Sequence, residues 1–137
     1  MTSKNFIDKT KTYIITALKA ANKFGCTIVL KGAHSIIASP DNRVFINPTG
    51  NASMAKAGAG DVLSGIIGGL LAQNIDPFVA AVAGTFIHGL AGEIASLELG
   101  MTSVLANDLS LSIASALERI TNNELSFFEE SLLEWKI

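Results

Sequence analysis

One short segment of the chain has residue types and spacing suited to handling phosphate. It reads AKAGAGDVLSG, residues 55–65, and places Gly58, Gly60 and Asp61 directly before an apolar helical pattern. The first N–H groups of a helix have no intrahelical partner and carry partial positive charge. Glycines there let phosphate oxygens approach these groups closely. The spacing therefore predicts an anion-binding site made by Ala57 to Gly60.

Asp61 adds a carboxylate to this predicted anion site. An ionised carboxylate beside bound phosphate can accept the proton of a hydroxyl group that attacks phosphorus, as phosphoryl transfer requires. A structural role fits equally well, because a negative charge in the first turn stabilises a helix by about 0.3–1 kcal/mol. The segment is neither a Walker motif nor a GxGxxG fingerprint, so on its own it leaves both roles open.

The elements expected to position this segment are a helix and three strands upstream, and three helices downstream. Apolar spacing predicts a helix over about Ser3–Phe24 that stops at Gly25. The segments CTIVLKG, HSIIAS and RVFIN predict three short strands, and the PDN between the last two indicates a hairpin turn. Three strands are few for so much helix, because an α/β sheet with helices on both faces would normally need more strands upstream.

The downstream helices are expected at about Gly60–Asn74, from Pro77 onward, and to about Ile120 after the VLAND segment. The N-cap of the last helix is expected to be Asn107 or Asp108. Three glycines of the first helix are expected to permit close packing against a neighbour: Gly65, Gly68 and Gly69. The tail, residues 123–137, is expected to form a short docking helix or a partner contact.

Composition narrows the function classes. A chain of 137 residues fits one domain, and its net charge of −2 disfavours nucleic acid as a partner. The only cysteine, Cys26, is expected to be a buried free thiol of a cytoplasmic protein. The apolar stretch 78–97 contains His88 and Glu93, so a buried helix is expected there rather than a membrane span. No His, Cys, Asp and Glu spacing indicates a metal site.

Four motifs, in order, resemble one enzyme family. LKGAHS, NPTGNASMAKAGAGDVLSG, LLAQ and HGLAGE lie within residues 30–100, and the likeness continues through LANDLSLSIASAL. Together they resemble the ADP-dependent NAD(P)H-hydrate dehydratases of the ribokinase-like superfamily. The resemblance implies an α/β ribokinase-like fold and a repair reaction. In that reaction ADP phosphorylates the ring hydroxyl of hydrated NADH or NADPH, and phosphate then leaves to restore the dihydropyridine.

The resemblance also implies roles for individual residues. Asp61 matches the acid at the substrate hydroxyl, so it is expected to bind substrate and act as the catalytic base. Gly60 matches a contact to the adenine nucleotide, and Asn47 and Asn51 lie in a matching loop without an assigned role. ADP is the expected co-substrate, and Mg²⁺ is expected to arrive with its phosphates. The expected nucleotide-binding residues are Lys31, Gly32, Ala33, His34, Ser35, Gly58, Ala59 and Gly60.

Alternatives remain for single residues. Lys31 could instead extend to solvent, and His34 suits a binding role and a structural one equally. His88, on an apolar helix face, is expected to form a hydrogen bond within the core.

The chain departs from the family pattern in places. Ala59 stands where the family usually has Thr, and Glu93, where the family has Asp, is expected to be peripheral. Family domains are longer, and the upstream half with early strands and a substrate segment has no counterpart here. The expectation is therefore one partial ribokinase-like domain over 1–137, which forms a homo-oligomer or joins a chain that supplies the missing half. The alternatives are a small-molecule kinase of the same fold, or a non-catalytic nucleotide-binding remnant or interaction subunit.

Overall fold

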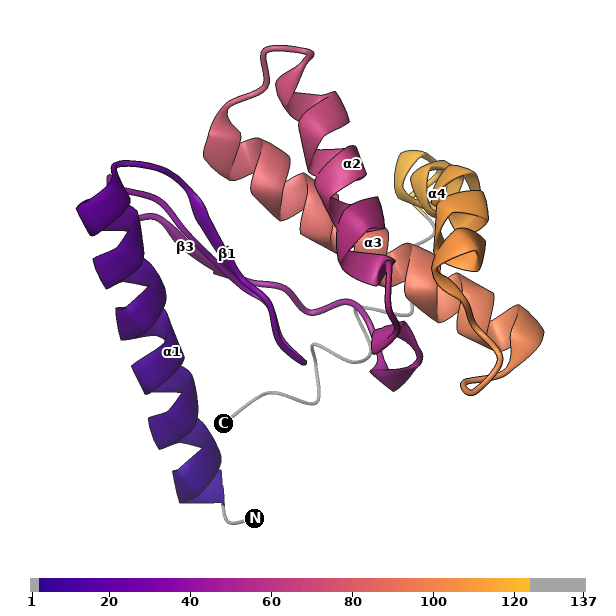
Figure 1. Ribbon diagram of the computed structural model, residues 1–137, viewed down its shortest axis with the longest axis horizontal. Coiled ribbons are helices and arrows are strands. Elements are labelled where there is room, and N and C mark those ends of the chain that lie inside the picture. Colours follow the sequence, from indigo (N-terminus) through magenta and orange to yellow (C-terminus); the bar gives the residue numbers. More distant parts are fainter. Residues whose placement is uncertain (1–2, 124–137) are drawn as a thin grey trace.

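The computed structural model describes residues 3–123, arranged as a single helix, a small sheet and a group of three helices (Figure 1). Helix α1 covers one side of the sheet, and helices α2, α3 and α4 lie on the other side. The expectation for the tail falls beyond Asn123 and so lies outside the described residues. The elements are α1 Ser3–Phe24, β1 Ile28–Leu30, β2 Ile36–Ala38, β3 Val44–Ile46, the short 3₁₀ helix η1 Ala52–Met54, α2 Ala59–Leu71, α3 Pro77–Leu99 and α4 Ala106–Thr121.

The sheet is antiparallel, in the order β1-β2-β3. Ile36 of β2 pairs with Leu30 of β1 on one side and with Ile46 of β3 on the other. The hairpin expected between the last two strands is confirmed: Asn42 has a φ of 66°, and its N–H donates to the Ser39 carbonyl at 3.0 Å. Asparagine tolerates this left-handed conformation, which explains the turn chemistry of the segment.

Helix α1 packs its small residues against the sheet. Ala17 and Ala21 are buried against Ile36 and Ala38 of β2. The helix ends as expected at Gly25, whose φ is 63° and whose N–H donates to the Ala21 carbonyl at 2.9 Å. The expectation that the cysteine is buried is wrong: Cys26 is exposed, because it lies in the connection before strand pairing begins.

Helix α3 is the central element of the helical group, because it packs against α2, α4, η1 and β2. It begins at Pro77 as expected, and Asp76 caps it by accepting the N–H groups of Phe78 and Val79, each at 3.1 Å. The helix is long and apolar enough to cross a bilayer, but 67% of its most apolar window is buried within the protein. That burial, with Ile87 and Leu90 in the core, is typical of a core helix.

Details of the other two helices differ from expectation. Helix α2 ends at Leu71, and a turn follows up to Asn74. The N-cap of α4 is Leu105, and the carboxylate of Asp108 accepts its N–H at 2.8 Å, so Asp108 acts from within the first turn.

The glycines of α2 do not serve the close packing expected of them. A Cβ atom added at Gly65, Gly68 or Gly69 would meet nothing within 4 Å in the described part of the chain. The close approach of α2 and α3 occurs at Gly84 of α3 instead, where an added Cβ would lie 2.5 Å from the Ile67 side chain.

Candidate functional site

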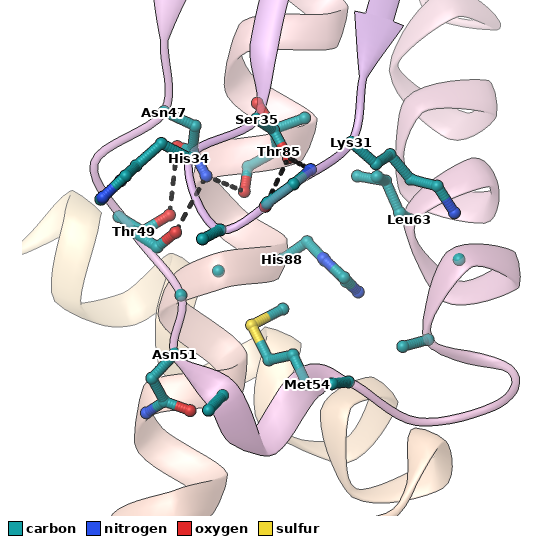
Figure 2. Close-up of a pocket in the computed structure, with 18 of the residues that line it drawn as sticks. Lys31, His34, Ser35, Asn47, Thr49, Asn51, Met54, Leu63, Thr85 and His88 are labelled. Carbon is teal, nitrogen blue, oxygen red and sulfur yellow. Dashed lines mark hydrogen bonds between the residues drawn. The ribbon is translucent and has the colours of Figure 1, made fainter. Parts of the chain in front are cut away.

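A pocket of about 680 Å³ lies where the sheet meets the helical group. Its walls come from the β1–β2 connection, the loop after β3, the first turn of α2 and the middle of α3 (Figure 2). It brings together seven of the eight residues predicted to bind nucleotide. These are Lys31, Gly32, Ala33, His34, Ser35, Ala59 and Gly60.

The β1–β2 connection, residues 31–35, forms one wall of this pocket. Lys31 reaches across to the start of α2, because a Cβ added at Gly60 would lie 2.6 Å from the Lys31 Nζ atom. The prediction that residues 31–35 and the glycine-rich segment form one site is consistent with this proximity. The Lys31 ammonium group lies at the positive end of the α2 dipole, where an anion would interact with both.

The first turn of α2 presents backbone N–H groups at the pocket. Gly58 is the N-cap with a φ of 87°, a conformation that a non-glycine residue adopts at a cost. The Ala59 N–H donates to Lys56 and the Asp61 N–H donates to Gly58, at 3.3 and 3.0 Å. Between them, the Gly60 N–H forms no backbone hydrogen bond within residues 3–123. Gly60 can therefore offer a donor to a ligand, as the sequence predicts.

Gly58 and Asp61 lie at the margin of this pocket rather than in its lining. Gly58 shapes the turn that aims the helix, and a Cβ there would lie 3.0 Å from the Ala106 side chain. Asp61 is exposed on the first turn of α2. Its carboxylate is thus next to the predicted anion site in sequence but faces solvent in this chain.

The loop after β3 is fastened to α3 by its polar side chains, and residues 47–54 are called the anchored loop below. The Asn47 side-chain amide donates to the carbonyls of Thr49 and Thr85, at 3.1 and 3.2 Å. The Thr49 hydroxyl donates to the Phe86 carbonyl at 3.0 Å. Asn51 donates to Ser96 at 2.9 Å. The sequence analysis assigns no role to Asn47 and Asn51, and in the structure their side chains fasten the anchored loop, which lines the pocket, to α3.

Glu93 and Gly89 complete the attachment of the anchored loop. The Gly50 N–H donates to the Glu93 carboxylate at 2.7 Å, so the expectation that Glu93 is peripheral is wrong. Burial raises the pKa of Glu93, and the Gly50 hydrogen bond offsets part of that rise. A Cβ at Gly89 would lie 2.0 Å from the Thr49 hydroxyl oxygen, so only glycine fits beneath the loop. The HGLAGE motif therefore includes residues that position this loop.

His88 projects from α3 into the pocket, between Lys31 and Met54 (Figure 2). The expectation of a core hydrogen bond is wrong for Nε2, which is buried and has no hydrogen-bond partner among the described residues. Burial is the main reason why the pKa of His88 lies below its ordinary value; the Ala59 backbone offsets this in part, and the Lys31 charge adds to it. The sequence signal was available: Thr85, His88 and Gly89 share one helical face, and all three line the pocket.

The titratable residues that line the pocket are all basic. Its titratable lining consists of Lys31, His34, Lys56 and His88, without an acidic residue from the described part of the chain. The described residues also contain no group of three His, Cys, Asp or Glu side chains able to hold a metal ion. These donors suit an anionic ligand, and a cation would have to enter with that ligand.

The fold is shared with a solved structure. The chain superposes on the crystal structure of the ADP/ATP-dependent NAD(P)H-hydrate dehydratase from Bacillus subtilis, co-crystallized with ATP/Mg²⁺, with a TM-score of 0.75 and 35% sequence identity. The match covers 80% of this chain and 40% of that one. The fold is therefore α/β and ribokinase-like, as the sequence predicts.

The particular family follows from the sequence comparisons. Residues 3–115 match the family described as NAD(P)H-hydrate dehydratase, and the chain belongs to that family. It is 50% identical over 93 residues to the bifunctional NAD(P)H-hydrate repair enzyme Nnr of Moorella thermoacetica, which covers 68% of this chain and 18% of the relative. It is 44% identical over 101 residues to the ADP-dependent (S)-NAD(P)H-hydrate dehydratase of Neisseria meningitidis serogroup B, which covers 73% of this chain and 34% of the relative. The chain thus spans about a fifth to a third of the length of these two relatives.

Proposed function

We propose that this chain is the nucleotide-binding part of an ADP-dependent NAD(P)H-hydrate dehydratase, a carbon–oxygen lyase that repairs hydrated NADH and NADPH. In the proposed reaction the β-phosphoryl group of ADP passes to the ring hydroxyl, and AMP leaves. The phosphate ester then eliminates phosphate with loss of a ring proton, so that the C–O bond breaks and the dihydropyridine forms. The observation that carries the proposal is the acid-free pocket between residues 31–35 and the first turn of α2.

The proposed nucleotide contacts divide between the two sides of the pocket. Lys31 supplies a positive charge and Gly60 a backbone donor to the phosphates, while residues 32–35 contact the remainder of the nucleotide. Gly58 and Ala59 set the direction of the α2 N-terminus. These roles are supported by the spacing of the motifs, by the lining of the pocket and by family membership.

Asp61 is the proposed catalytic base. Its exposed carboxylate lies one residue beyond Gly60, so a hydroxyl group that approaches the bound phosphate from outside the pocket would meet it. Magnesium fits this arrangement only as a companion of the nucleotide, because the pocket lining offers it no carboxylate. Bound to the phosphates, it would neutralise their charge and keep most of its water ligands.

The proposed partner is a second polypeptide segment, either a counterpart of the part of the longer relatives that lies outside the match or another copy of the chain. Helix and strand surfaces left open in this chain support it: Val44, Ile46, Leu97 and Leu111 are exposed apolar side chains. A cytoplasmic location also belongs to the proposal, because an exposed cysteine without a second cysteine in the sequence suits a reducing compartment.

A second candidate function is nucleotide binding without catalysis, in a remnant or an interaction subunit. The observation that favours it is the position of Asp61, which is exposed and lies outside the lining of the pocket. A hydroxyl group of a molecule bound in the pocket would then meet no carboxylate of the lining that could accept its proton. In this candidate function the pocket still binds the nucleotide, but Asp61 is not a catalytic base.

Reconstitution separates the two candidates. Recovery of NADH absorbance from its hydrate is measured with ADP and Mg²⁺ for this chain alone, for a polypeptide carrying the missing part, and for the mixture. We expect activity only in the mixture, and loss of it with Asp61→Ala in this chain. A stable complex without activity would favour the non-catalytic candidate, and robust activity of this chain alone would contradict the need for a partner.

A further inference from the structure

His88 contains a buried polar atom whose hydrogen-bonding capacity the protein itself leaves unused. The side chain is 8% exposed, and its Nε2 atom has no hydrogen-bond partner among the described residues. A buried polar atom without a partner costs about 1–3 kcal/mol, so such atoms are rare in folded proteins. Because His88 lines the pocket, a molecule bound there could supply the hydrogen-bond partner that Nε2 lacks.

The charges around His88 indicate what kind of ligand would bind there. Burial is the largest cause of the lowered pKa of His88, the Ala59 backbone partly offsets it, and the nearby Lys31 charge lowers the pKa further. The other titratable groups that line the pocket are also basic, His34 and Lys56, and the Lys56 ammonium group donates to the Thr102 carbonyl at 3.1 Å. The ligand that suits these surroundings is an anion.

The acidic groups of the neighbouring elements face elsewhere. On α2 the only charged residue is Asp61, which is exposed and outside the pocket lining. On α3 itself, Glu93 accepts the Gly50 N–H, and Glu98 is exposed near the C-terminal end of the helix. On α4, Asp108 accepts the Leu105 N–H, while Glu118 and Arg119 are exposed at the far end of that helix. Strand β2 and η1 carry no charged residue. No carboxylate of the described chain therefore supplies the counter-charge that a protonated His88 would need.

We propose that His88 is a phosphate-binding residue, which donates from Nε2 to a phosphate oxygen held at the N-terminus of α2 and takes up a proton from solvent as that phosphate binds. The proposal rests on the proposed nucleotide site, because the phosphate is that of the nucleotide. Three positive groups then surround one anion: the Gly60 N–H at the helix end, the Lys31 ammonium group and the His88 imidazolium. Burial disfavours the charged imidazole in the free chain, and a bound phosphate gives that charged form a partner.

The direct test is the titration of His88 in the complete 137-residue chain. Imidazole ¹⁵N signals are followed by NMR from about pH 5 to pH 8, and a His34→Gln sample assigns the signals, because the chain has two histidines. We expect the pKa of His88 to rise when ADP or pyrophosphate binds and to stay unchanged with adenosine, which has no phosphate. A His88 pKa that is unmoved at saturation with ADP would overturn the proposal.

Binding measurements supply the second test. Pyrophosphate affinity is measured by calorimetry over the same pH range for the wild type, His88→Gln and Ser112→Ala. Ser112 is the matched control, because it is also 8% exposed but lies on α4 outside the pocket. Relative to His88→Gln, the wild type should gain affinity as pH falls, by about tenfold for each pH unit between the free and bound pKa values. The comparison with His88→Gln cancels the ionisation of the ligand itself, and Ser112→Ala should follow the wild type.

The outcomes distinguish this proposal from the one it rests on. If wild type and His88→Gln bind pyrophosphate and ADP equally at every pH, the nucleotide site stands and the role of His88 is refuted. If the wild-type chain binds neither ADP nor pyrophosphate, the nucleotide site and the role of His88 fail together. If adenosine shifts the His88 signals as much as ADP does, the imidazole contacts the nucleoside and the phosphate contact is refuted.

Discussion

Two regions line opposite sides of the same pocket and differ in how they use their polar groups. In the anchored loop, residues 47–54, every polar side chain has a hydrogen-bond partner, and most of these partners lie on α3 or within the loop. At the start of α2, Lys31 converges with Gly60, and the Gly60 N–H has no backbone partner in the described residues. The polar side chains of the anchored loop have partners without a ligand, whereas the start of α2 has donors that a ligand could use.

The two regions are therefore expected to contribute to different properties of the protein. A polar group with a partner inside the protein contributes to stability, and its loss is felt on unfolding. A polar group or a charge aimed at a pocket contributes to ligand binding and costs stability in the free protein. Substitutions in the anchored loop should therefore change the free energy of unfolding, and those at the start of α2 should change affinity and turnover.

Asp61 gives the largest expected effect. In a reconstituted active complex, Asp61→Ala should lower turnover about 10²–10⁴-fold, because a general base is lost. ADP affinity should change little, since Asp61 lies outside the pocket lining. Steady-state rates of NADH recovery measure the first effect and calorimetry the second.

Asp108 is the matched control for Asp61, because it too is an acid in the first turn of a helix. Asp108→Ala removes the acceptor of the Leu105 N–H and should lower stability by about 1 kcal/mol without changing turnover. If both variants retain wild-type turnover, Asp61 is a helix-end charge like Asp108.

Gly60 gives the next largest effect. Gly60→Val should weaken ADP binding by about a hundredfold or more, equivalent to about 2.7 kcal/mol, because the side chain displaces Lys31 and covers the free N–H. Backbone strain does not contribute, because Gly60 is helical; in this segment the glycine with a positive φ is Gly58. Gly65→Val makes the same change where an added Cβ meets nothing within 4 Å, and should bind ADP as the wild type does. Equal ADP affinity in the two folded variants would exclude an anion site at Gly60.

The sequence predicts much of this fold for physical reasons that can be named. The α1 helix, the hairpin and the start of α3 each follow from local signals: apolar spacing ended by Gly25, the turn at Asn42, and Pro77 after a capping residue. The sequence also predicts that residues 31–35 and 58–60 belong to one site, and the pocket lining contains all of them except Gly58.

Other features depend on contacts between distant segments and could not be read from local pattern. The bond between Glu93 and Gly50 joins residues 43 positions apart, and sequence spacing says nothing of it. The pKa of His88 depends on burial, on the Ala59 backbone and on the Lys31 charge, and both of these residues lie far before His88 in the chain. Likewise, Gly84 rather than Gly65 meets a neighbour because the crossing point of α2 and α3 is a tertiary property.

Gly89 tests the anchored loop through packing. In Gly89→Ala the new Cβ would lie 2.0 Å from the Thr49 hydroxyl oxygen and 2.7 Å from its carbonyl carbon, so the loop backbone has to move. We expect a loss of about 1–3 kcal/mol in the free energy of unfolding, as for other overpacked sites. Gly68→Ala, where nothing lies within 4 Å, should instead gain about 0.5–1 kcal/mol from helix propensity. Urea unfolding of both variants measures the difference in the free energy of unfolding. Equal stabilities would show that the anchored loop moves to accommodate the new Cβ without an energetic cost.

Glu93 tests the same loop through pH and gives the smallest effect. Burial raises the pKa of Glu93 above its ordinary value, despite the Gly50 hydrogen bond, so the folded protein holds this proton more tightly than the unfolded chain does. The free energy of unfolding contributed by Glu93 should therefore fall as pH rises from the unfolded pKa through the higher folded one. Glu93→Gln cannot ionise but keeps an oxygen to accept the Gly50 N–H, so it should lack this slope.

Urea unfolding between about pH 4 and pH 8 compares the Glu93→Gln variant with the wild type. Glu118→Gln is the control, because it makes the same change at an exposed position of α4 and should retain the wild-type slope. A Glu93→Gln variant with an unchanged slope would mean that the buried carboxylate is already compensated, and that the anchored loop carries no pH-dependent cost.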